Sequence, residues 1–508
     1  MTDMSRCSEH SRLRRYLLSA VLLIGSGFLW LPISSTAGEE RPDVLFIVID
    51  DLNDWVGVLG GNPQAQTPNI DSLAARGMTF TNAHAVSTAC LPSRTAMLTG
   101  VSPFTSGVYD QSGDWRDVEM LQNVPTLPQH FRESGYVTTG AGKIFHAHTY
   151  RSIGLSGQQD VDAWDAFYPS LERQLPDELR PLDAPVNGNP LVVEATEGGS
   201  IDVRWLHTGF DWSAVVADDR AMGDGQVTAW IEEQLLATSA GPRFIAAGIY
   251  KPHLPWYVPP AYFDLYPLES VAVPDVPDDD LDDVPEAAPF QGRPGGPSEP
   301  TEQHEWVVSN DLWQGAVRGY LASISFADAM VGRIIAALER SGRADDTIVV
   351  LTSDHGFHLG EKKRWRKMTL WEESTRVPLI IVSPGTTRPG STSSEAVSLL
   401  DVYPTLVELA GLDAPAHLDG ESLLPLLRDP GAKRDRPAIS VWGYGNYAVR
   451  DERYRYIRYA DGSEELYDHE TDPNEWTNLA EDDAYRKVKA DLARFIPEAA
   501  AESYTAGR

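Results

Sequence analysis

Cysteine is nearly absent from this chain of 508 residues, which contains only Cys7 and Cys90. Cys7 lies in an N-terminal segment that we expect to be removed, so the mature chain would keep a single thiol. An internal disulfide framework is therefore excluded. A lone cysteine in an exported protein is unusual and calls for a chemical reason.

Long apolar runs are also scarce, and the longest lies near the N-terminus, from Tyr16 to Ile33. Arg12, Arg14 and Arg15 lie just before it, and small residues ending at Ala37 follow it. This order is typical of a secretory signal peptide over residues 1–37, with export to the periplasm or the extracellular space. The alternative is an uncleaved anchor, because a run of roughly 20 residues can span a bilayer. No other stretch is expected to be long and apolar enough to span a membrane, so membrane contact is predicted only during export.

Positively charged residues are also few relative to negatively charged ones. The chain has 42 Lys and Arg against 74 Asp and Glu, giving a formal net charge of −32. That balance argues against non-specific binding of nucleic acid. Any anionic ligand must therefore be held by a local cationic site. Apolar residues make up 42% of the chain, with 14 Trp and 19 Tyr, which excludes general disorder and permits a sizeable core.

Continuous apolar runs predict buried parallel strands rather than half-exposed ones. These runs are Val44–Ile49, Tyr136–Ala141, Phe244–Tyr250, Ile348–Thr352 and Leu379–Val382. Helical patterns, such as that of Ala316–Arg340, lie between them. The alternation predicts an α/β fold with a large mixed, mainly parallel sheet flanked by helices.

We expect the main domain to cover residues 41–430. Within it, Val273–Pro300 is rich in Pro, Gly and Asp and is predicted to be an exposed loop. From residue 431 to 508 the pattern changes to Arg/Tyr alternation over Ala448–Tyr459 and a further run at Glu464–Asp468. This predicts a small antiparallel sheet followed by a C-terminal helix.

The carboxyl ends of the predicted strands carry polar side chains, and ligands of open α/β sheets bind at that edge. Four strand ends supply three carboxylates, three histidines and two lysines: Asp50, Asp51, Lys143, His146, Lys251, His253, Asp354 and His355. Each alone is commonly a turn, cap or core residue. Together, three Asp and one His favour a hard divalent cation, Ca²⁺ or Mg²⁺.

Cys90 opens the segment from Cys90 to Gly100, in which Pro92 is a natural first helical residue and Gly100 a natural stop. Cys90 is therefore predicted at a helix N-terminus, where free N–H groups favour an anion. Two other interpretations stand beside a modified cysteine. One is a buried structural thiol, and the other is a simple thiolate nucleophile.

Over its eleven residues, Cys90–Gly100 resembles the signature of the type I sulfatases of the alkaline phosphatase superfamily. The resemblance extends from Asp43 to about Arg428, with Lys143, His253 and Lys367 in the family's order. Several stretches look most like iduronate-2-sulfatases, and His355, where many sulfatases carry Asn, favours that branch. These stretches are Thr67–Asp71, Gly142–His146, Lys251–Pro255 and Ser353–Gly356.

The resemblance implies that a maturation enzyme oxidises Cys90 to formylglycine, whose hydrate attacks sulfur. It implies one Ca²⁺ per chain, held by Asp50, Asp51, Cys90, Asp354 and His355. Arg94 would orient the hydrate and the metal ligands. Lys143 and Lys367 would neutralise sulfate oxygens, His146 would act as base, and His253 would protonate the leaving sugar oxygen.

The resemblance further implies a sulfated oligo- or polysaccharide substrate, with sulfate at O2 of a uronic acid or a related sugar. Two other functions remain open, a phosphodiesterase or phosphonate monoester hydrolase and a non-catalytic glycan-binding protein. Lys363 and Arg364 are candidate substrate contacts, because they belong to a basic run from Lys362 to Lys367. The alternative for this run is a solvated loop. A second basic group comprises Arg450, Arg453, Arg455 and Arg458.

Overall fold

The computed structural model describes residues 41–111, 113–146, 160–168, 210–214, 218–288 and 299–504. The predicted signal peptide, with Cys7, lies outside these residues. Its cleavage and the export of the chain therefore stay predictions.

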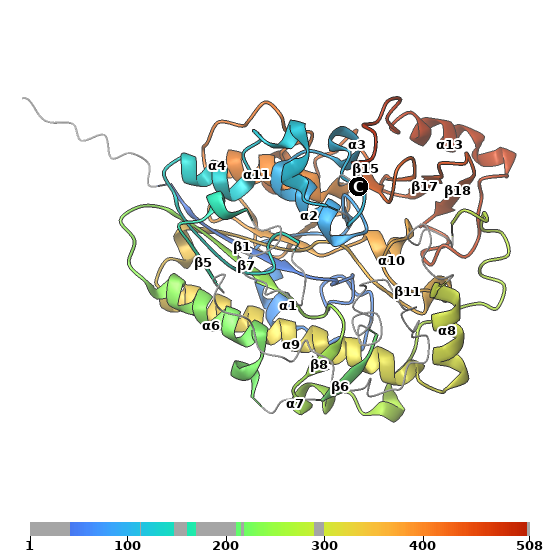
Figure 1. Ribbon diagram of the computed structural model, residues 1–508, viewed down its shortest axis with the longest axis horizontal. Coiled ribbons are helices and arrows are strands. Elements are labelled where there is room, and N and C mark those ends of the chain that lie inside the picture. The colour runs from blue at the N-terminus through green and yellow to red at the C-terminus, as the bar shows by residue number, and fades with distance from the viewer. Residues whose placement is uncertain are drawn as a thin grey trace, which may run out of the picture. The chain divides into compact units, whose positions relative to one another are not determined.

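An eight-stranded sheet forms the centre of the fold, in the order β13-β2-β12-β9-β1-β7-β4-β5 (Figure 1). Its parallel part comprises β1 (Asp43–Ile49), β4 (Val137–Gly142), β5 (Ala166–Tyr168), β7 (Arg243–Ile249) and β9 (Thr347–Ser353). The rest comprises β2 (Met78–Phe80), β12 (Leu379–Val382) and β13 (Ser391–Ser393). All five predicted strands are present, each within one residue of its expected ends. The predicted α/β class with a mainly parallel sheet is confirmed.

The expected direction of β12 is wrong, because β12 runs antiparallel to both β9 and β2. All four of its residues are buried. A strand covered on both faces is continuously apolar whichever way it runs, so the sequence pattern could not distinguish the two directions.

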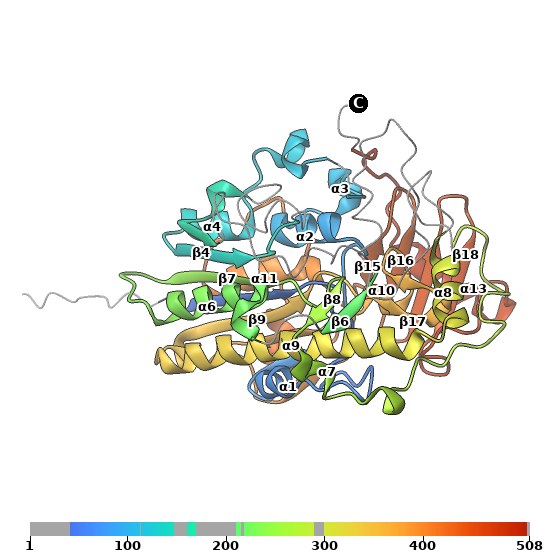
Figure 2. The ribbon, with the colours of Figure 1, turned by 60° about the horizontal axis from the view of Figure 1, so that its bottom comes forward.

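Helices cover both faces of the sheet (Figure 2). Side chains alternate along β1, so its residues pack with one set of helices on one face and another set on the other. Leu45, Ile47 and Ile49 pack with helices α1 (Pro68–Ala74), α6 (Gly223–Leu236) and α9 (Trp313–Arg340). Val44, Phe46 and Val48 pack on the other face with α2 (Cys90–Thr99), α4 (Leu127–Glu133) and α11 (Val402–Leu409). β1 is therefore the buried centre from which the site is built.

Helix α9 corrects one expectation, because by length and composition it could cross a membrane. Within the protein, 72% of its most apolar window is buried, and it packs on β1 and its neighbours. It is the central core helix of this fold.

Residues near the C-terminus form a four-stranded antiparallel sheet of β15 (Ala438–Val441), β16 (Tyr447–Arg450), β17 (Tyr454–Arg458) and β18 (Glu464–Asp468). Helix α13 (Arg486–Ala493) follows. The expected antiparallel sheet and helix are confirmed, whereas the division of the chain at residue 430 stays a prediction.

Short elements complete the description. Paired strands are β3 (Ala83–His84) with β14 (Val397–Ser398), β6 (Trp212–Ala214) with β8 (Trp256–Val258), and β10 (His358–Leu359) with β11 (Trp365–Arg366). Short helices are α3 (Pro103–Ser106), α7 (Pro260–Phe263), α8 (Glu299–Ser309), α10 (Glu372–Thr375) and α12 (Leu424–Arg428).

The predicted loop over Val273–Pro300 is only partly as expected. Its residues up to 288 form turns and irregular chain, whereas Glu299 and Pro300 begin α8. Asp280 is 2% exposed, so the expectation of exposure is wrong there. Asp280 is buried because its carboxylate pairs with Lys362, which no local sequence pattern reveals.

Candidate active site

Two neighbouring strands deliver the predicted carboxylates to one place. Ile49 at the end of β1 pairs in register with Ser353 at the end of β9. The next residues are therefore Asp50 and Asp51 on one strand and Asp354 and His355 on the other. All four are completely buried.

Helix α2 places Cys90 against these strand ends. The helix begins at Cys90 itself, after Ala89, so the expectation that Pro92 is its first residue is wrong. Proline is tolerated throughout the first helical turn because those N–H groups have no partner within the helix. The expected stop is confirmed, since Gly100 adopts φ +71°. Every residue of α2 is buried, so its positive N-terminal end acts inside the protein.

Arg94, one turn into α2, connects the two strand ends through Asp50 and Asp354. Its Nη2 donates to Asp50 Oδ1 at 3.1 Å and its Nε to Asp354 Oδ2 at 2.7 Å. Its Nη1 donates to the carbonyl of Ile144 at 2.9 Å. One guanidinium therefore ties α2, β1, β9 and the segment after β4 together.

Two lysines enter from other segments. Lys143 Nζ, just after β4, lies 2.5 Å from Asp50 Oδ2, and Lys367 Nζ lies 2.5 Å from Asp51 Oδ1. Burial would raise the pKa of Asp50, but Lys143 and Arg94 hold it below its usual range. Asp50 is therefore kept ionised by fixed cations.

Three histidines surround the thiol. His355 Nε2 lies 3.3 Å from Cys90 Sγ. A hydrogen bond with His146 also lowers the pKa of Cys90. His253 Nε2 lies 4.0 Å from Asp51 Oδ2, and its Nδ1 contacts Tyr250 Oη at 2.8 Å and the Leu254 carbonyl at 2.6 Å. His253 is held through Nδ1 and presents Nε2 to the site.

The charge balance at Cys90 favours an anion. Burial by itself raises the pKa of the thiol, whereas Lys143, Lys367 and His355 lower it. The net pKa of Cys90 lies well below that of an ordinary thiol. A negatively charged group at this position is thus stabilised by the surrounding cations.

The donor set fits a hard cation. Asp50, Cys90, Asp354 and His355 each offer an atom within 4.8 Å of the others, and so do Asp50, Asp51, Cys90 and His253. Asp51 Oδ2 is buried without a hydrogen-bond partner, which is an unfavourable state for a carboxylate oxygen. Carboxylate oxygens directed at one point are typical of Ca²⁺ and Mg²⁺ sites.

Comparison with known proteins decides the family. The sulfatase family matches residues 42–412, which is well over half of the chain. The chain belongs to the sulfatase family. The family described as N-sulphoglucosamine sulphohydrolase, C-terminal, matches residues 360–502.

Individual relatives agree with this assignment. A sulfatase of Formosa agariphila is 35% identical, with 90% of this chain and 87% of that one covered. The iduronate 2-sulfatase of Homo sapiens is 32% identical, with 77% and 75% covered. The crystal structure of a phosphonate monoester hydrolase of Agrobacterium radiobacter shares the fold, with TM-score 0.70, 23% identity, and 89% and 94% covered. The predicted resemblance to type I sulfatases is confirmed, and the protein is a sulfuric ester hydrolase.

In this sulfatase, the residues of the basic run Lys362–Lys367 differ in burial and in their contacts. Lys367 reaches Asp51 in the site, whereas Lys362 is 2% exposed and pairs with Asp280 at 2.7 Å. Lys363 is half-buried, and its Nζ donates to the Asp278 carbonyl at 2.5 Å. Arg364 is 2% exposed, and burial lowers its pKa to about 10. The run is therefore neither a solvated loop nor one continuous binding surface.

The second basic group is mostly structural. Arg455 is completely buried and pairs with Glu372 and Glu475. His469 Nε2 lies 2.9 Å from Glu475 Oε1. Glu372, His469 and Glu475 could by geometry hold a metal, but the Arg455 guanidinium already pairs with both carboxylates.

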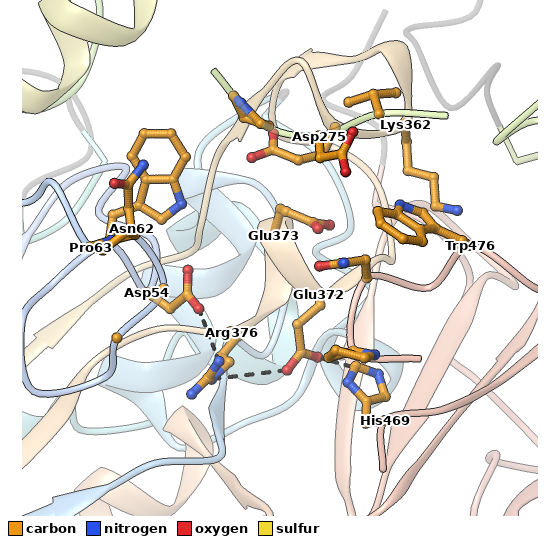
Figure 3. A pocket seen from close by; sticks show the side chains of 18 of the residues that line it. Asp54, Asn62, Pro63, Asp275, Lys362, Glu372, Glu373, Arg376, His469 and Trp476 are labelled. Carbon is orange, nitrogen blue, oxygen red and sulfur yellow. Dashed lines mark hydrogen bonds and ion pairs between the residues drawn. The ribbon is translucent and has the colours of Figure 1, made fainter. Parts of the chain in front are cut away.

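A cavity of about 640 Å³ lies beside this cluster (Figure 3). Arg376 bridges Asp54 and Glu372 at its wall, at 2.9 and 4.0 Å. None of the predicted catalytic or metal-binding residues lines this cavity. It is therefore separate from the site around Cys90.

Sequence reasoning missed the groups that support the turn containing Asp51 in the sulfatase. Tyr320 on α9 donates to the Asp51 carbonyl at 2.7 Å, although 269 positions separate the two residues. Its apolar surroundings in a helical pattern gave no signal of this contact. Ser353 is the last residue of the strand that precedes Asp354, but that position alone did not predict its contact with the turn.

Proposed function

We propose that this sulfatase removes sulfate from O2 of a uronic acid or related sugar in a sulfated oligo- or polysaccharide. We further propose that it uses formylglycine at residue 90 and one bound Ca²⁺. The observation that carries the proposal is the placement of the lone thiol of Cys90. It sits at a buried helix N-terminus, 3.3 Å from His355 and among three aspartates and three cations.

Two groups that the encoded amino acids do not provide, the modified side chain of residue 90 and a bound metal ion, would complete this chemistry. The hydrate of formylglycine at residue 90 would supply the attacking oxygen, and a bound Ca²⁺ would supply Lewis-acid stabilisation of negative charge. The preference for Ca²⁺ over Mg²⁺ rests on the number of oxygen donors and on export of the chain. Asp50, Asp51, Asp354, His355 and residue 90 would hold the ion.

The chain's own residues then have distinct roles. Lys143 and Lys367 place positive charge beside the carboxylates, where they can neutralise sulfate oxygens. His146, hydrogen-bonded to residue 90, is positioned to accept a proton from it. His253 presents Nε2 from a ring held through Nδ1, as a general acid for the leaving sugar oxygen requires.

An anionic substrate is repelled at long range by a chain of net charge −32. At physiological salt the long-range field is screened beyond about 8 Å, so short-range cations determine binding. Arg94, Lys143 and Lys367 supply three such cations inside the site. The assignment of O2 and of a uronic acid rests on the likeness to the human protein named iduronate 2-sulfatase.

The phosphonate monoester hydrolase of the same fold supports a second candidate activity. A glycan-binding protein without activity is the remaining alternative. Parallel assays of sulfate release from sulfated sugars and of phosphonate or phosphate ester hydrolysis separate the three. Sulfate release as the dominant activity supports the proposal, and dominant phosphonate hydrolysis or no turnover contradicts it.

Peptide mass spectrometry across residue 90 tests the nucleophile directly. We expect loss of sulfur and gain of oxygen in enzyme made together with a maturation system. An active preparation that carries only unmodified cysteine would instead support the thiolate alternative. A panel of defined sulfated oligosaccharides then tests the position of the sulfate and the identity of the sugar.

A further inference from the structure

The turn that follows β1 has an unusual backbone. Asp51 is not glycine, yet it adopts φ +61°, in the left-handed region that L-residues rarely occupy. Aspartate tolerates this region better than most residues, but the conformation still needs support from its surroundings. Asp51 is completely buried, so solvent does not provide that support.

Side chains, not secondary structure, satisfy the backbone of this turn. The N–H of Asp51 donates to Asp354 Oδ1 at 3.2 Å, and the N–H of Leu52 donates to Ser353 Oγ at 3.0 Å. The N–H of Asn53 donates to Tyr320 Oη at 3.1 Å, and Tyr320 Oη donates to the carbonyl of Asp51 at 2.7 Å. Each of these buried groups would otherwise lack a partner, which is costly.

Both hydroxyls are fully engaged in holding the turn. Tyr320 Oη accepts from Asn53 and donates to Asp51, so it spans the turn from one side. Ser353 Oγ accepts from Leu52 and donates to the carbonyl of His355 at 2.9 Å, so it links the turn to the second ligand segment. Both hydroxyls can meet their partners only while the turn keeps this shape.

The ring of Tyr320 is fixed independently of its hydroxyl. It packs edge-on against Trp55 and Trp256 at centroid distances of 5.6 Å and stacks on Phe357 at 5.6 Å. A phenylalanine would keep these contacts. It would leave the Asp51 carbonyl and the Asn53 N–H buried without partners.

We propose that Tyr320 and Ser353 are positioning residues for the metal ligand Asp51. Their hydroxyls hold Asp51 in the left-handed conformation that directs Oδ1 to Lys367 and leaves Oδ2 for the cation. This inference rests on the proposed metal site. Partners of this kind, one step behind a metal ligand, change metal affinity by about 10- to 100-fold when removed.

The test compares Tyr320→Phe with Tyr266→Phe. Tyr266 is a matched control because its buried hydroxyl also accepts a backbone N–H, from Gln66, and contacts α9 through Ser325. The Kd for Ca²⁺ is measured by calorimetry on chelator-treated, full-length protein. We expect wild type and Tyr266→Phe to bind equally, and Tyr320→Phe to bind about tenfold more weakly or worse. Saturating Ca²⁺ should return kcat of Tyr320→Phe towards that of wild type.

The outcomes separate the two proposals. A wild-type protein that binds no divalent cation contradicts the proposed function. A wild type that binds Ca²⁺, with the same Kd in Tyr320→Phe, overturns the inference alone. If Tyr320→Phe does not fold, Ser353→Ala decides, with Ser440→Ala as control because that buried hydroxyl donates to a backbone carbonyl outside the turn, that of Ala85. Equal Kd values in Ser353→Ala and Ser440→Ala then overturn it.

Discussion

Arg94 donates from Nε to Asp354 Oδ2 at 2.7 Å, and neither side chain is exposed to solvent. The same guanidinium reaches Asp50 at 3.1 Å, so one cation fixes the ends of two parallel strands. Arginine suits this task because its planar fork holds two acceptors in a set geometry, which lysine cannot do.

Arg94→Met should therefore damage both stability and catalysis. The change leaves two buried carboxylates without their shared cation, which destabilises a protein by about 3–5 kcal/mol. Arg243→Met is the matched control, because Arg243 pairs with buried Asp43 at 2.7 Å at the opposite end of the same strand.

Urea unfolding and kcat/KM of the two variants give the comparison. Both should lose stability, but only Arg94→Met should also lose activity, by roughly 10- to 100-fold beyond what unfolding explains. Equal losses of activity in the two variants would mean that Arg94 acts only through stability.

Calcium binding should strengthen as the pH rises from about 6 to 9. Without metal, burial and the neighbouring Asp50 raise the pKa of Asp354 to about 7. Burial alone would lower the pKa of His355, but Asp354 and Cys90 raise it to about 9. Both groups must lose protons before they can bind the ion, so metal binding releases protons.

The stability of the metal-free protein should change with pH in the opposite direction to calcium binding, because it should fall as the pH rises. The pKa of Asp354 is raised above its unfolded value, so its contribution falls as the pH rises from about 4 to 7. The contribution of His355 is present below about 6.5 and is lost as the pH rises through about 9. His355→Asn should flatten the upper part of both profiles, as calorimetry and chemical unfolding at several pH values would show. An unchanged slope contradicts the role of His355.

Much of this site could be predicted from the sequence because Asp50, Asp51, Asp354 and His355 follow strands whose apolar runs are easy to identify. Asp50, Lys143 and Asp354 directly follow β1, β4 and β9, and parallel strands bring their carboxyl ends to one edge. The direction of β12 was not accessible, because a strand buried on both faces looks the same in either direction. Tyr320 was not accessible either, because its partner Asp51 is distant in sequence.

The two buried lysines of the basic run should separate stability from sulfate handling. Lys362→Met leaves Asp280 buried without its partner, so we expect a loss of about 3–5 kcal/mol in unfolding free energy and little change in KM. Lys367→Ala should lower kcat/KM on every sulfate ester, because Lys367 contacts Asp51 inside the site. If Lys362→Met changes KM as much as Lys367→Ala does, this division of roles is wrong.

Lys363 and Arg364 are neighbours in sequence but differ in exposure, which allows a direct test of substrate recognition. Lys363 is half-buried, whereas Arg364 is 2% exposed. Lys363→Ala should weaken kcat/KM for an anionic sulfated oligosaccharide more than for a small neutral aryl sulfate. The difference should shrink at high salt, because interactions between exposed charges are screened beyond about 8 Å at physiological salt and over shorter distances at higher salt. Arg364→Ala should mainly lower stability, because its enclosed side chain is removed from a packed site.

Measuring both variants with both substrates at two salt concentrations distinguishes the roles. If Lys363→Ala loses equally on the two substrates, Lys363 does not contact the sugar. If Arg364→Ala is selective for the oligosaccharide while its stability is unchanged, Arg364 is the recognition residue.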